Sequence, residues 1–274
     1  MKYRIIDTHA HIFPMKIQEK AVDAIGTFYG IPMEHSGEGT SEGLLASGGK
    51  IGVEKYIVCS TATVPKQVTA INDFVSGECA KHLEFIGFGT LHPAMDGIPE
   101  ELDRCLSLGF RGIKLHPDFQ EFNIDSPDAM PMYREIAKRG MFLLIHLGDA
   151  ERPYTKPERM RRVLDEIPEL KVFGAHFGGY HAWDEAYEAY EPGMLWMDIS
   201  SSLYLMDKKL TYRFFDKFGL ENFFFGSDFP MWDHSEELGR FMALGLSEEQ
   251  NRMILAENFL RVYGEKQGKN GPEI

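Results

Sequence analysis

Residues 4–11 read Arg4-Ile5-Ile6-Asp7-Thr8-His9-Ala10-His11, a short strand pattern that ends in two histidines two residues apart. Successive residues of a strand point to opposite faces, so His9 and His11 project from one face, with Cα atoms roughly 6.5–7 Å apart. Two imidazoles held in this way can bind one metal ion. Asp7 shares their face and could orient one of the rings. For an isolated pair, the alternative is one packed histidine beside one that hydrogen-bonds a backbone carbonyl.

Further apolar segments follow this strand at regular spacing, each succeeded by a helical pattern. The segments lie at 55–59, 85–91, 110–116, 141–146, 170–176, 195–199 and 222–228, and clear helical patterns at about 16–29, 65–82, 100–108, 128–139, 157–167 and 247–263. Eight strands alternating with helices predict an α/β fold, a (β/α)₈ TIM barrel, as a single domain over residues 1–274 with a frayed tail at 264–274. A doubly wound open sheet is the alternative, but no G-x-G-x-x-G motif follows an early strand.

The segment 36–52 interrupts this regularity. It contains six glycines, at positions 37, 39, 43, 48, 49 and 52. Long glycine-rich connections in compact domains commonly serve as lids or binding loops, so we expect this one to lie over the mouth of the barrel. Plain surface irregularity is an equal alternative.

Composition restricts the classes of partner. The chain of 274 residues carries 42 acidic and 29 basic side chains, for a formal charge of −13. Such a surface repels phosphate, which disfavours nucleic acids and anionic membranes, and no apolar run reaches the roughly 20 residues that span a bilayer. Three cysteines without a C-x-x-C pair indicate reduced thiols in a cytoplasmic protein, and the strand pattern from Tyr3 leaves no room for a leader. We expect a small-molecule substrate, and aromatic residues in the loops are compatible with a homodimer.

Polar side chains stand at one end of the expected strands. They are His9 and His11 on the first strand, Lys114 and His116 on the fourth, His146 on the fifth, His176 on the sixth and Asp228 on the eighth. Active sites of this fold lie at the carboxyl ends of the strands, so these side chains should converge. Packing is a poor explanation, because a core would place apolar residues there. The pattern therefore predicts a metal site.

Several of these stretches together resemble the amidohydrolase superfamily. They are the His9-x-His11 pair after an Ile-Asp strand, Gly-Ile-Lys114-Leu-His116-Pro, His146, Ala-His176-Phe-Gly-Gly and Phe-Gly-Ser-Asp228-Phe-Pro. The similarity is greatest to the amidohydrolase-related branch, which includes aminocarboxymuconate-semialdehyde decarboxylase and the resorcylate decarboxylases. It extends from residue 4 to about residue 263, where 254–263 resembles the closing helix of that branch.

The resemblance implies a divalent metal, with zinc as the first choice and manganese as the second. Its ligands would be His9, His11, His146 and Asp228. Asp228 and His176 would be the catalytic residues, because Asp228 can take a proton from a water whose pKa the metal lowers to about 7, and His176 can polarise a carbonyl or leaving group.

Two activities fit these residues. The first is hydrolysis of an amide, ester or lactone of a small carboxylated molecule, and the alternative is non-oxidative decarboxylation of the aminocarboxymuconate-semialdehyde type. A metal-binding barrel without catalysis would need no proton acceptor, whereas Asp228 and His176 supply two such groups.

The side chain of Lys114 could have one of several roles. Some members of the superfamily carbamylate a lysine on the fourth strand to bridge two metals. A free ammonium that pairs with an acidic residue, or that binds a substrate carboxylate, is the alternative.

Three further residues are candidate substrate contacts: His116, Arg152 and Trp232. His116 stands at a strand end before Pro117, Arg152 lies in the loop after His146, and Trp232 follows the eighth strand. Arg152 could hold a carboxylate through two hydrogen bonds, or it could be an ordinary exposed arginine. Three other histidines, His35, His82 and His234, are expected at the surface.

Overall fold

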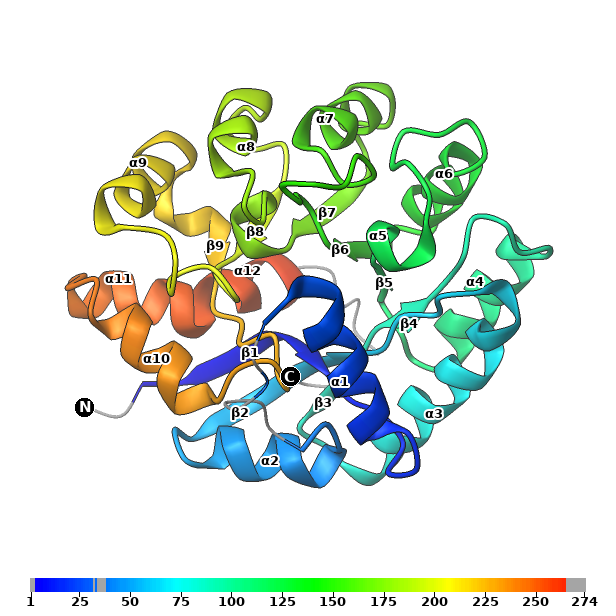
Figure 1. Ribbon diagram of the computed structural model, residues 1–274, viewed down its shortest axis with the longest axis horizontal. Helices are drawn as coiled ribbons and strands as arrows, with labels where there is room; N and C mark the ends of the chain where they lie inside the picture. Colours follow the sequence, from blue (N-terminus) through cyan, green and yellow to red (C-terminus); the bar gives the residue numbers. More distant parts are fainter. Residues whose placement is uncertain (1–2, 32, 34–37, 265–274) are drawn as a thin grey trace.

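The computed structural model describes residues 3–31, 33 and 38–264. Parallel strands form a central ring with helices around it (Figure 1). The strands are β1 (Ile5–His11), β2 (Val53–Cys59), β3 (Phe85–Gly87), β4 (Gly89–Thr90), β5 (Gly112–Leu115), β6 (Phe142–Ile145), β7 (Lys171–Gly174), β8 (Trp196–Asp198) and β9 (Phe223–Phe224). Each falls within a segment expected to be a strand or begins within two residues of one. The expected parallel α/β fold is therefore confirmed.

Two seams divide the ring into sheets of order β1-β2-β3 and β4 to β9. At the first seam only Phe88 separates β3 from β4, and its N–H still donates to the carbonyl of Val58 at 3.0 Å. β3 and β4 thus act as one interrupted strand, which accounts for the eight expected positions. Across the second seam, backbone hydrogen bonds join β1 to the residues after β9: Thr8 N to Phe225 O (2.9 Å), Asp228 N to His9 O (2.8 Å) and His11 N to Phe229 O (2.6 Å). These bonds link the last strand to the first, as a barrel requires.

Helices occupy all six segments expected to be helical, and further helices occur between them. They are α1 (Gln18–Tyr29), α2 (Ser41–Gly49), α3 (Val68–Lys81), α4 (Ile98–Ser107), α5 (Pro117–Gln120), α6 (Met130–Lys138), α7 (Pro157–Glu166), α8 (Trp183–Ala189), α9 (Lys208–Phe218), α10 (His234–Met242), α11 (Glu248–Arg252) and α12 (Asn258–Gly264). A π-helical turn, Met253–Glu257, joins α11 to α12. Ser247 and Gln250 form a capping box at the start of α11, each side chain accepting from the backbone of the other.

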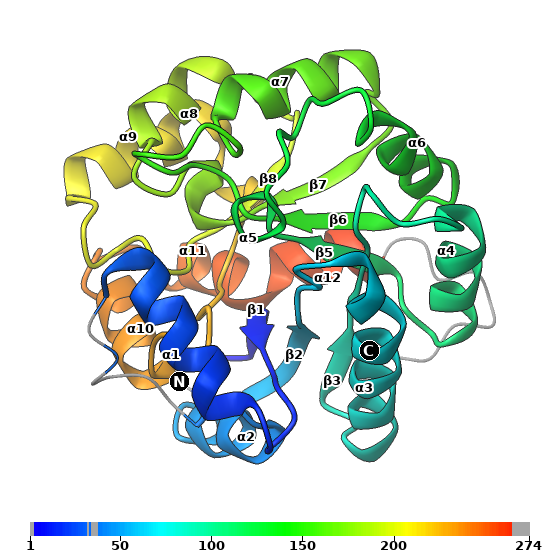
Figure 2. The same ribbon diagram turned by 45° about the vertical axis from the view of Figure 1, so that its right-hand side comes forward.

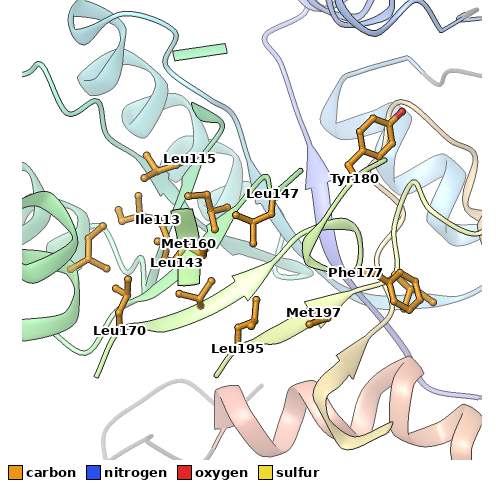
Figure 3. Packing of buried hydrophobic residues seen from close by; sticks show 14 of the residues in the cluster. Ile113, Leu115, Leu143, Leu147, Met160, Leu170, Phe177, Tyr180, Leu195 and Met197 are labelled. Carbon is orange, nitrogen blue, oxygen red and sulfur yellow. The ribbon is translucent and has the colours of Figure 1, made fainter. Parts of the chain in front are cut away.

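Strand alternation produces two apolar layers. One cluster takes residues from strands all around the ring and from α12, so it lies inside the ring. Its members include Ile6, Ile57, Phe88, Phe142, Leu144, Phe173, Phe224, Phe259 and Tyr263. A second layer packs between the strands and the helices, where Ile113 and Leu143 lie beside Met160 of α7 (Figure 3). The aromatic cluster fills the amino end of the barrel, so the cavity is left at the carboxyl end.

The expected glycine-rich lid is wrong for the described part of 36–52, because residues 41–49 form helix α2. Thr40 caps this helix by accepting from the N–H of Gly43 at 3.1 Å. Gly48 allows close packing, since a Cβ there would overlap the ring of Tyr56. Tertiary packing has thus overridden the low helix propensity of glycine. Positions 36 and 37 lie outside the described residues.

The mouth of the barrel is instead covered by α1. Figure 2 shows this helix beside the end of β1. Its apolar residues Ala21, Ile25 and Phe28 line the same cavity as His9 and His11. The covering element is therefore an ordinary helix after the first strand.

Three smaller expectations concern the chain as a whole. Cys59, Cys79 and Cys105 are free thiols, as expected from their spacing. Within residues 3–31, 33 and 38–264, every helix is too short or too polar to cross a bilayer. The expected frayed tail lies outside the described residues, except for Gly264 at the end of α12.

Candidate metal centre

The carboxyl ends of the strands surround a cavity of about 800 Å³. Eight of the nine residues singled out from the sequence line it: His9, His11, Lys114, His116, His146, His176, Asp228 and Trp232. The ninth, Arg152, is outside the set of described residues that line the cavity. The expected convergence of strand-end side chains therefore occurs.

His9, His11 and Asp228 form a compact group on the floor of this cavity. The rings of His9 and His11 lie side by side, with centroids 5.1 Å apart. Their Nε2 atoms lie 3.5 and 3.3 Å from Oδ1 of Asp228. Asp228 has φ of +57° at the turn after β9, and Ser201 donates to its Oδ2 at 2.6 Å, which leaves Oδ1 for the histidines. The three side chains can hold one cation between them.

In His9, His146 and His176, a hydrogen bond from one ring nitrogen fixes the tautomer and shows which nitrogen keeps its lone pair. Nδ1 of His9 meets the Asp198 carboxylate at 3.0 Å, and Nδ1 of His176 meets the carbonyl of Ser200 at 3.0 Å. Both acceptors require an N–H, so Nε2 keeps its lone pair in each ring. His146 is reversed, because its Nε2 meets the Gly148 carbonyl at 3.0 Å and its Nδ1 is therefore free.

These free nitrogens point toward the cavity floor. Nδ1 of His146 lies 3.1 Å from Nε2 of His176, and the rings of His9 and His176 are stacked with centroids 5.2 Å apart. His146 does not belong to the compact group of His9, His11 and Asp228 within the described residues; it reaches that group through His176. Three of the four expected ligands, His9, His11 and Asp228, thus lie together. The fourth, His146, lies next to His176, the expected acid/base residue.

Asp198, at the end of β8, was missed from the sequence. Its Oδ2 is the partner of His9, while Oδ1 accepts from the backbone N–H groups of His176 and Ser200 at 3.1 and 3.0 Å. Burial by itself would raise its pKa, but His9 and the other donors outweigh that effect and lower the pKa of Asp198 to about 2. A carboxylate behind a ligating histidine fixes its orientation. The available signal was the position of Asp198 in the expected strand 195–199.

The charges around the floor favour neutral histidines and an ionised aspartate. Burial and the neighbouring Lys114 lower the pKa of His9 to about 4. Burial, and to a smaller extent the neighbouring His176, lower the pKa of His146 well below its usual range. Burial opposes ionisation of Asp228, yet the adjacent His9 and the hydrogen bond to His11 hold its pKa well below the usual value. His11 differs: against the effect of burial, Cys59 and Asp228 raise its pKa to about 9.

Lys114 lies inside this group. Its Nζ is 2.8 Å from Nε2 of His9, its side chain is fully buried, and burial lowers its pKa. Among the described residues no aspartate or glutamate lies within ion-pairing distance of Nζ, so the expected pairing with an acidic residue is wrong. The carbamylated form and a role in binding a substrate carboxylate remain predictions.

His116 and Trp232 both line the cavity. The ring of His116 is stacked between those of Phe119 and His146, with centroids 3.8 and 4.1 Å away, and its Nε2 lies 2.8 Å from the hydroxyl of Tyr29. Trp232 donates through Nε1 to the hydroxyl of Ser201 at 2.9 Å, the same hydroxyl that holds Asp228. The expected contact of His116 and Trp232 with a substrate stays a prediction.

Arg152 takes a different position. Its guanidinium meets Asp149 at 3.2 Å and lies 3.7 Å above the ring of Phe28 on α1, whose carbonyl it also contacts at 3.3 Å. The arginine thus fastens the end of α1 to the loop after β6. Its expected contact with a substrate carboxylate stays a prediction.

Two expectations beside the site are wrong. Asp7 orients neither His9 nor His11 through a ring nitrogen; its Oδ2 meets Nε2 of His234 at 2.9 Å and the hydroxyl of Ser227 at 2.5 Å. The register of β1 against β2 also shifts between Asp7 and Ala10. His234, expected at the surface, is fully buried by its contact with Asp7. His82 is half-buried beside Phe85, and His35 lies outside the described residues.

The donor set fits a divalent metal. Imidazole nitrogens and one carboxylate oxygen are ligands that zinc and similar ions prefer, and ligating histidines usually donate their other N–H to a carboxylate or carbonyl. His9, His146 and His176 each do so. His9, His11 and Asp228 are placed to hold the ion together, and His146 as its fourth ligand stays a prediction.

A parallel barrel with histidines and an aspartate at its strand ends defines a metal-binding TIM-barrel enzyme. The chain belongs to the amidohydrolase family, whose model, described as amidohydrolase, matches residues 6–264. The resemblance inferred from the motifs is therefore confirmed, and the protein is an enzyme of the hydrolase or carboxy-lyase type.

Solved structures agree on the fold. The chain is similar to 5-carboxyvanillate decarboxylase LigW from Sphingomonas paucimobilis (17% identity, TM-score 0.73, covering 96% of this chain and 99% of that one). It is also similar to a candidate 2-pyrone-4,6-dicarboxylic acid hydrolase from Acinetobacter baumannii with citric acid bound (16%, 0.69, 96% and 100%). A third similar structure is a dihydroxybenzoic acid decarboxylase from Polaromonas with bound manganese and 2-nitroresorcinol (14%, 0.72, 98% and 99%). These likenesses confirm the TIM-barrel fold.

Proposed function

We propose that the protein is a metal-dependent hydrolase that cleaves an amide, ester or lactone of a small carboxylated molecule. The observation that carries this proposal is the contact of Asp228 with both His9 and His11 on the floor of the cavity. This arrangement places a proton acceptor directly beside the group that would hold the ion, as the activation of water requires.

The chain's own residues divide the work as follows. A bound divalent ion, zinc as first choice or manganese as second, would acidify a water. Asp228 would accept the proton of that water at Oδ1, because its Oδ2 is already occupied by Ser201. His176, whose Nδ1–H is held by the Ser200 carbonyl, would take up this proton at Nε2 and then polarise the carbonyl or protonate the leaving group.

The shape of the cavity supports a small substrate with an apolar body. Beyond the polar floor, the wall is formed by apolar residues of α1 and α3: Ala21, Ala24, Ile25, Phe28, Ala70, Ile71 and Phe74. A cleft of this size with a few convergent polar groups is typical of small-molecule sites. Lys114 and His116 would contact a carboxylate placed near the floor, and Trp232 would border it.

The second candidate function is non-oxidative decarboxylation at the same floor. The apolar wall favours it, because an aromatic acid would pack its ring there. Two of the similar structures are decarboxylases of aromatic acids by their names. His176 would then supply the proton that replaces the carboxyl group.

One experiment separates the two functions. Protein loaded with Zn²⁺ or Mn²⁺ is incubated in ¹⁸O-labelled water with a panel of lactones, amides and esters, and separately with carboxyl-¹³C aromatic acids. Hydrolysis places one ¹⁸O atom in the product, whereas decarboxylation releases labelled CO₂. The proposal predicts ¹⁸O incorporation that disappears in Asp228→Asn. Labelled CO₂ without ¹⁸O incorporation selects the second candidate. The absence of both signals contradicts both candidates.

A further inference from the structure

The ring of Trp232 is held beside the cavity by side chains that the proposed reaction does not use. The guanidinium of Arg240 lies 4.5 Å from the centroid of this ring, and the ring of Tyr204 lies 4.6 Å from it. The indole N–H donates to the hydroxyl of Ser201 at 2.9 Å. Because a tryptophan carries only one polar hydrogen, this N–H is already used within the protein. Trp232 therefore has a partner to act on besides any substrate.

Helix α10 adds a buried carboxyl group at the same place. Glu237 is 1% exposed, and Arg240, one turn further along the helix, donates to it. The backbone N–H of Ser201 donates to the same carboxyl group. A buried carboxyl group needs such donors to offset the loss of water. Glu237, Arg240 and Trp232 thus form one connected group, which we call the Ser201 clamp. Arg240 connects the other two residues, and each of these contacts Ser201.

Ser201 is fixed through both its backbone and its side chain. Its φ of +48° lies in the left-handed region, which residues other than glycine seldom adopt. Such a conformation persists only where the surroundings determine it, as the clamp does here. With the indole N–H directed at Oγ, the single hydrogen of the hydroxyl is left for Oδ2 of Asp228, which accepts it at 2.6 Å. The clamp thereby fixes a donor against one chosen oxygen of Asp228.

We infer that the three clamp residues are positioning residues that act through Ser201 and leave Asp228 with one oxygen available to the ion. Oδ2 is held by the hydroxyl, and Oδ1 is the oxygen that lies 3.5 and 3.3 Å from Nε2 of His9 and His11. Carboxylates bind cations through one oxygen or through two, and the bond to Oδ2 disfavours the second mode. A position on the ion then stays open for water or substrate, as catalysis requires. This role rests on the proposed metal site and is the same for either reaction proposed above.

Metal binding tests the inference without turnover. Chelator-treated protein is titrated with Mn²⁺ by calorimetry, and Ser201→Gly is compared with the wild type, because glycine accepts the positive φ and the fold should be kept. The variant should bind Mn²⁺ about 10- to 100-fold more weakly, since the group that orients a ligand is lost. Weaker binding supports the inference whatever the turnover experiment gives, and equal affinity overturns it. A wild type that binds no Mn²⁺ contradicts the metal site and the role of the clamp together.

Ser202→Ala is the matched control for this titration. The hydroxyl of Ser202 is also buried and lies one residue further along the chain, but it donates to the carbonyl of Ser200 at 2.9 Å instead of to Asp228. This variant should bind Mn²⁺ like the wild type. An equal loss of affinity in Ser202→Ala and Ser201→Gly shows that any buried hydroxyl of this turn has the same effect, and overturns the inference.

Co²⁺ and Trp232→Phe separate positioning from packing and from substrate contact. The visible absorption of bound Co²⁺ depends on its coordination number, so a second oxygen from Asp228 should change the spectrum. Trp232→Phe keeps an aromatic ring but removes the N–H. It should change the Co²⁺ spectrum in the same direction as Ser201→Gly and weaken Mn²⁺ binding about 5-fold, the effect of one neutral hydrogen bond. A wild-type spectrum with a lower melting temperature shows a packing role, and a wild-type spectrum with a raised KM shows a substrate contact. Either result overturns the positioning role of Trp232.

Discussion

Two of the buried aspartate–histidine pairs among the described residues look alike but do different things. Asp198 meets Nδ1 of His9 at 3.0 Å, and Asp7 meets Nε2 of His234 at 2.9 Å. All four side chains are buried. The second nitrogen of His9 faces Asp228 in the cavity, whereas that of His234 is 2.9 Å from the hydroxyl of Ser47.

The difference between the pairs lies in what remains free. His234 uses both nitrogens to connect β1 with α2 and α10, so it can only stabilise the fold. His9 uses one nitrogen for orientation, and its other nitrogen faces the cavity floor, where Nζ of Lys114 lies at 2.8 Å and Oδ1 of Asp228 at 3.5 Å. A buried aspartate–histidine pair is therefore not evidence of a site by itself; a ring nitrogen directed into a cavity is.

The largest expected effect comes from the group that His9 faces. Asp228→Asn should reduce kcat by about 10²- to 10⁴-fold, because it removes the proton acceptor while keeping the shape of the side chain. Steady-state kinetics on the metal-loaded variant checks this. Asp165→Asn on α7, which loses only an exposed ion pair with Arg161, is the control and should be unchanged. Activity of Asp228→Asn close to that of the wild type would show that the residue has another role.

Breaking the first pair should affect the metal more than the fold. Asp198→Asn is expected to lower metal affinity by about 10- to 100-fold, since the carboxylate that orients His9 is lost. Competition with a chelator of known affinity measures the change. If metal affinity stays constant while the protein melts earlier, the Asp198–His9 pair is structural and the comparison fails.

Breaking the second pair should do the opposite. His234→Ala leaves Oδ2 of Asp7 with one donor, Ser227, and is expected to lower the free energy of unfolding by about 1–3 kcal/mol. Urea denaturation followed by circular dichroism gives this value. The folded variant should retain its metal, and a variant that folds normally but has lost the metal would contradict the distinction drawn above.

The smallest effect is expected at Arg152, which fastens α1 above the cavity. Arg152→Gln removes the guanidinium from the ring of Phe28 and should lower the free energy of unfolding by about 0.5–1 kcal/mol. KM for a carboxylated substrate should change little if the guanidinium stays with Asp149. A large rise in KM with unchanged stability would instead confirm the carboxylate-binding role predicted from the sequence.

The sequence was sufficient to predict which side chains converge at the carboxyl ends of the strands. His9 and His11 share a face by simple alternation, and Lys114, His146 and Asp228 follow apolar strands, so the rules for parallel barrels were enough to bring them together. Asp198 obeys the same rule at the end of β8 and could have been included. The partner of Asp198 could not be predicted, because that partner is His9, which lies 189 positions away in the sequence.

Other features depended on contacts that local patterns do not contain. His234 is followed by the polar residues Ser235, Glu236 and Glu237, yet Asp7 and Ser47 enclose it from two distant elements. The glycines of α2 suggested a loop, but Gly48 is needed there because the ring of Tyr56 packs against it. The register shift after Asp7 likewise has no signal in the residues themselves.

The central claim is that His9, and not His234, belongs to a metal site on the cavity floor. Calorimetric titration of chelator-treated protein with Mn²⁺ tests it most directly, with His9→Ala and His234→Ala compared at a temperature where both are folded. The structure predicts a tight site in the wild type that is lost in His9→Ala and kept in His234→Ala. Equal Mn²⁺ binding by the two variants, or no binding by the wild type, would contradict it.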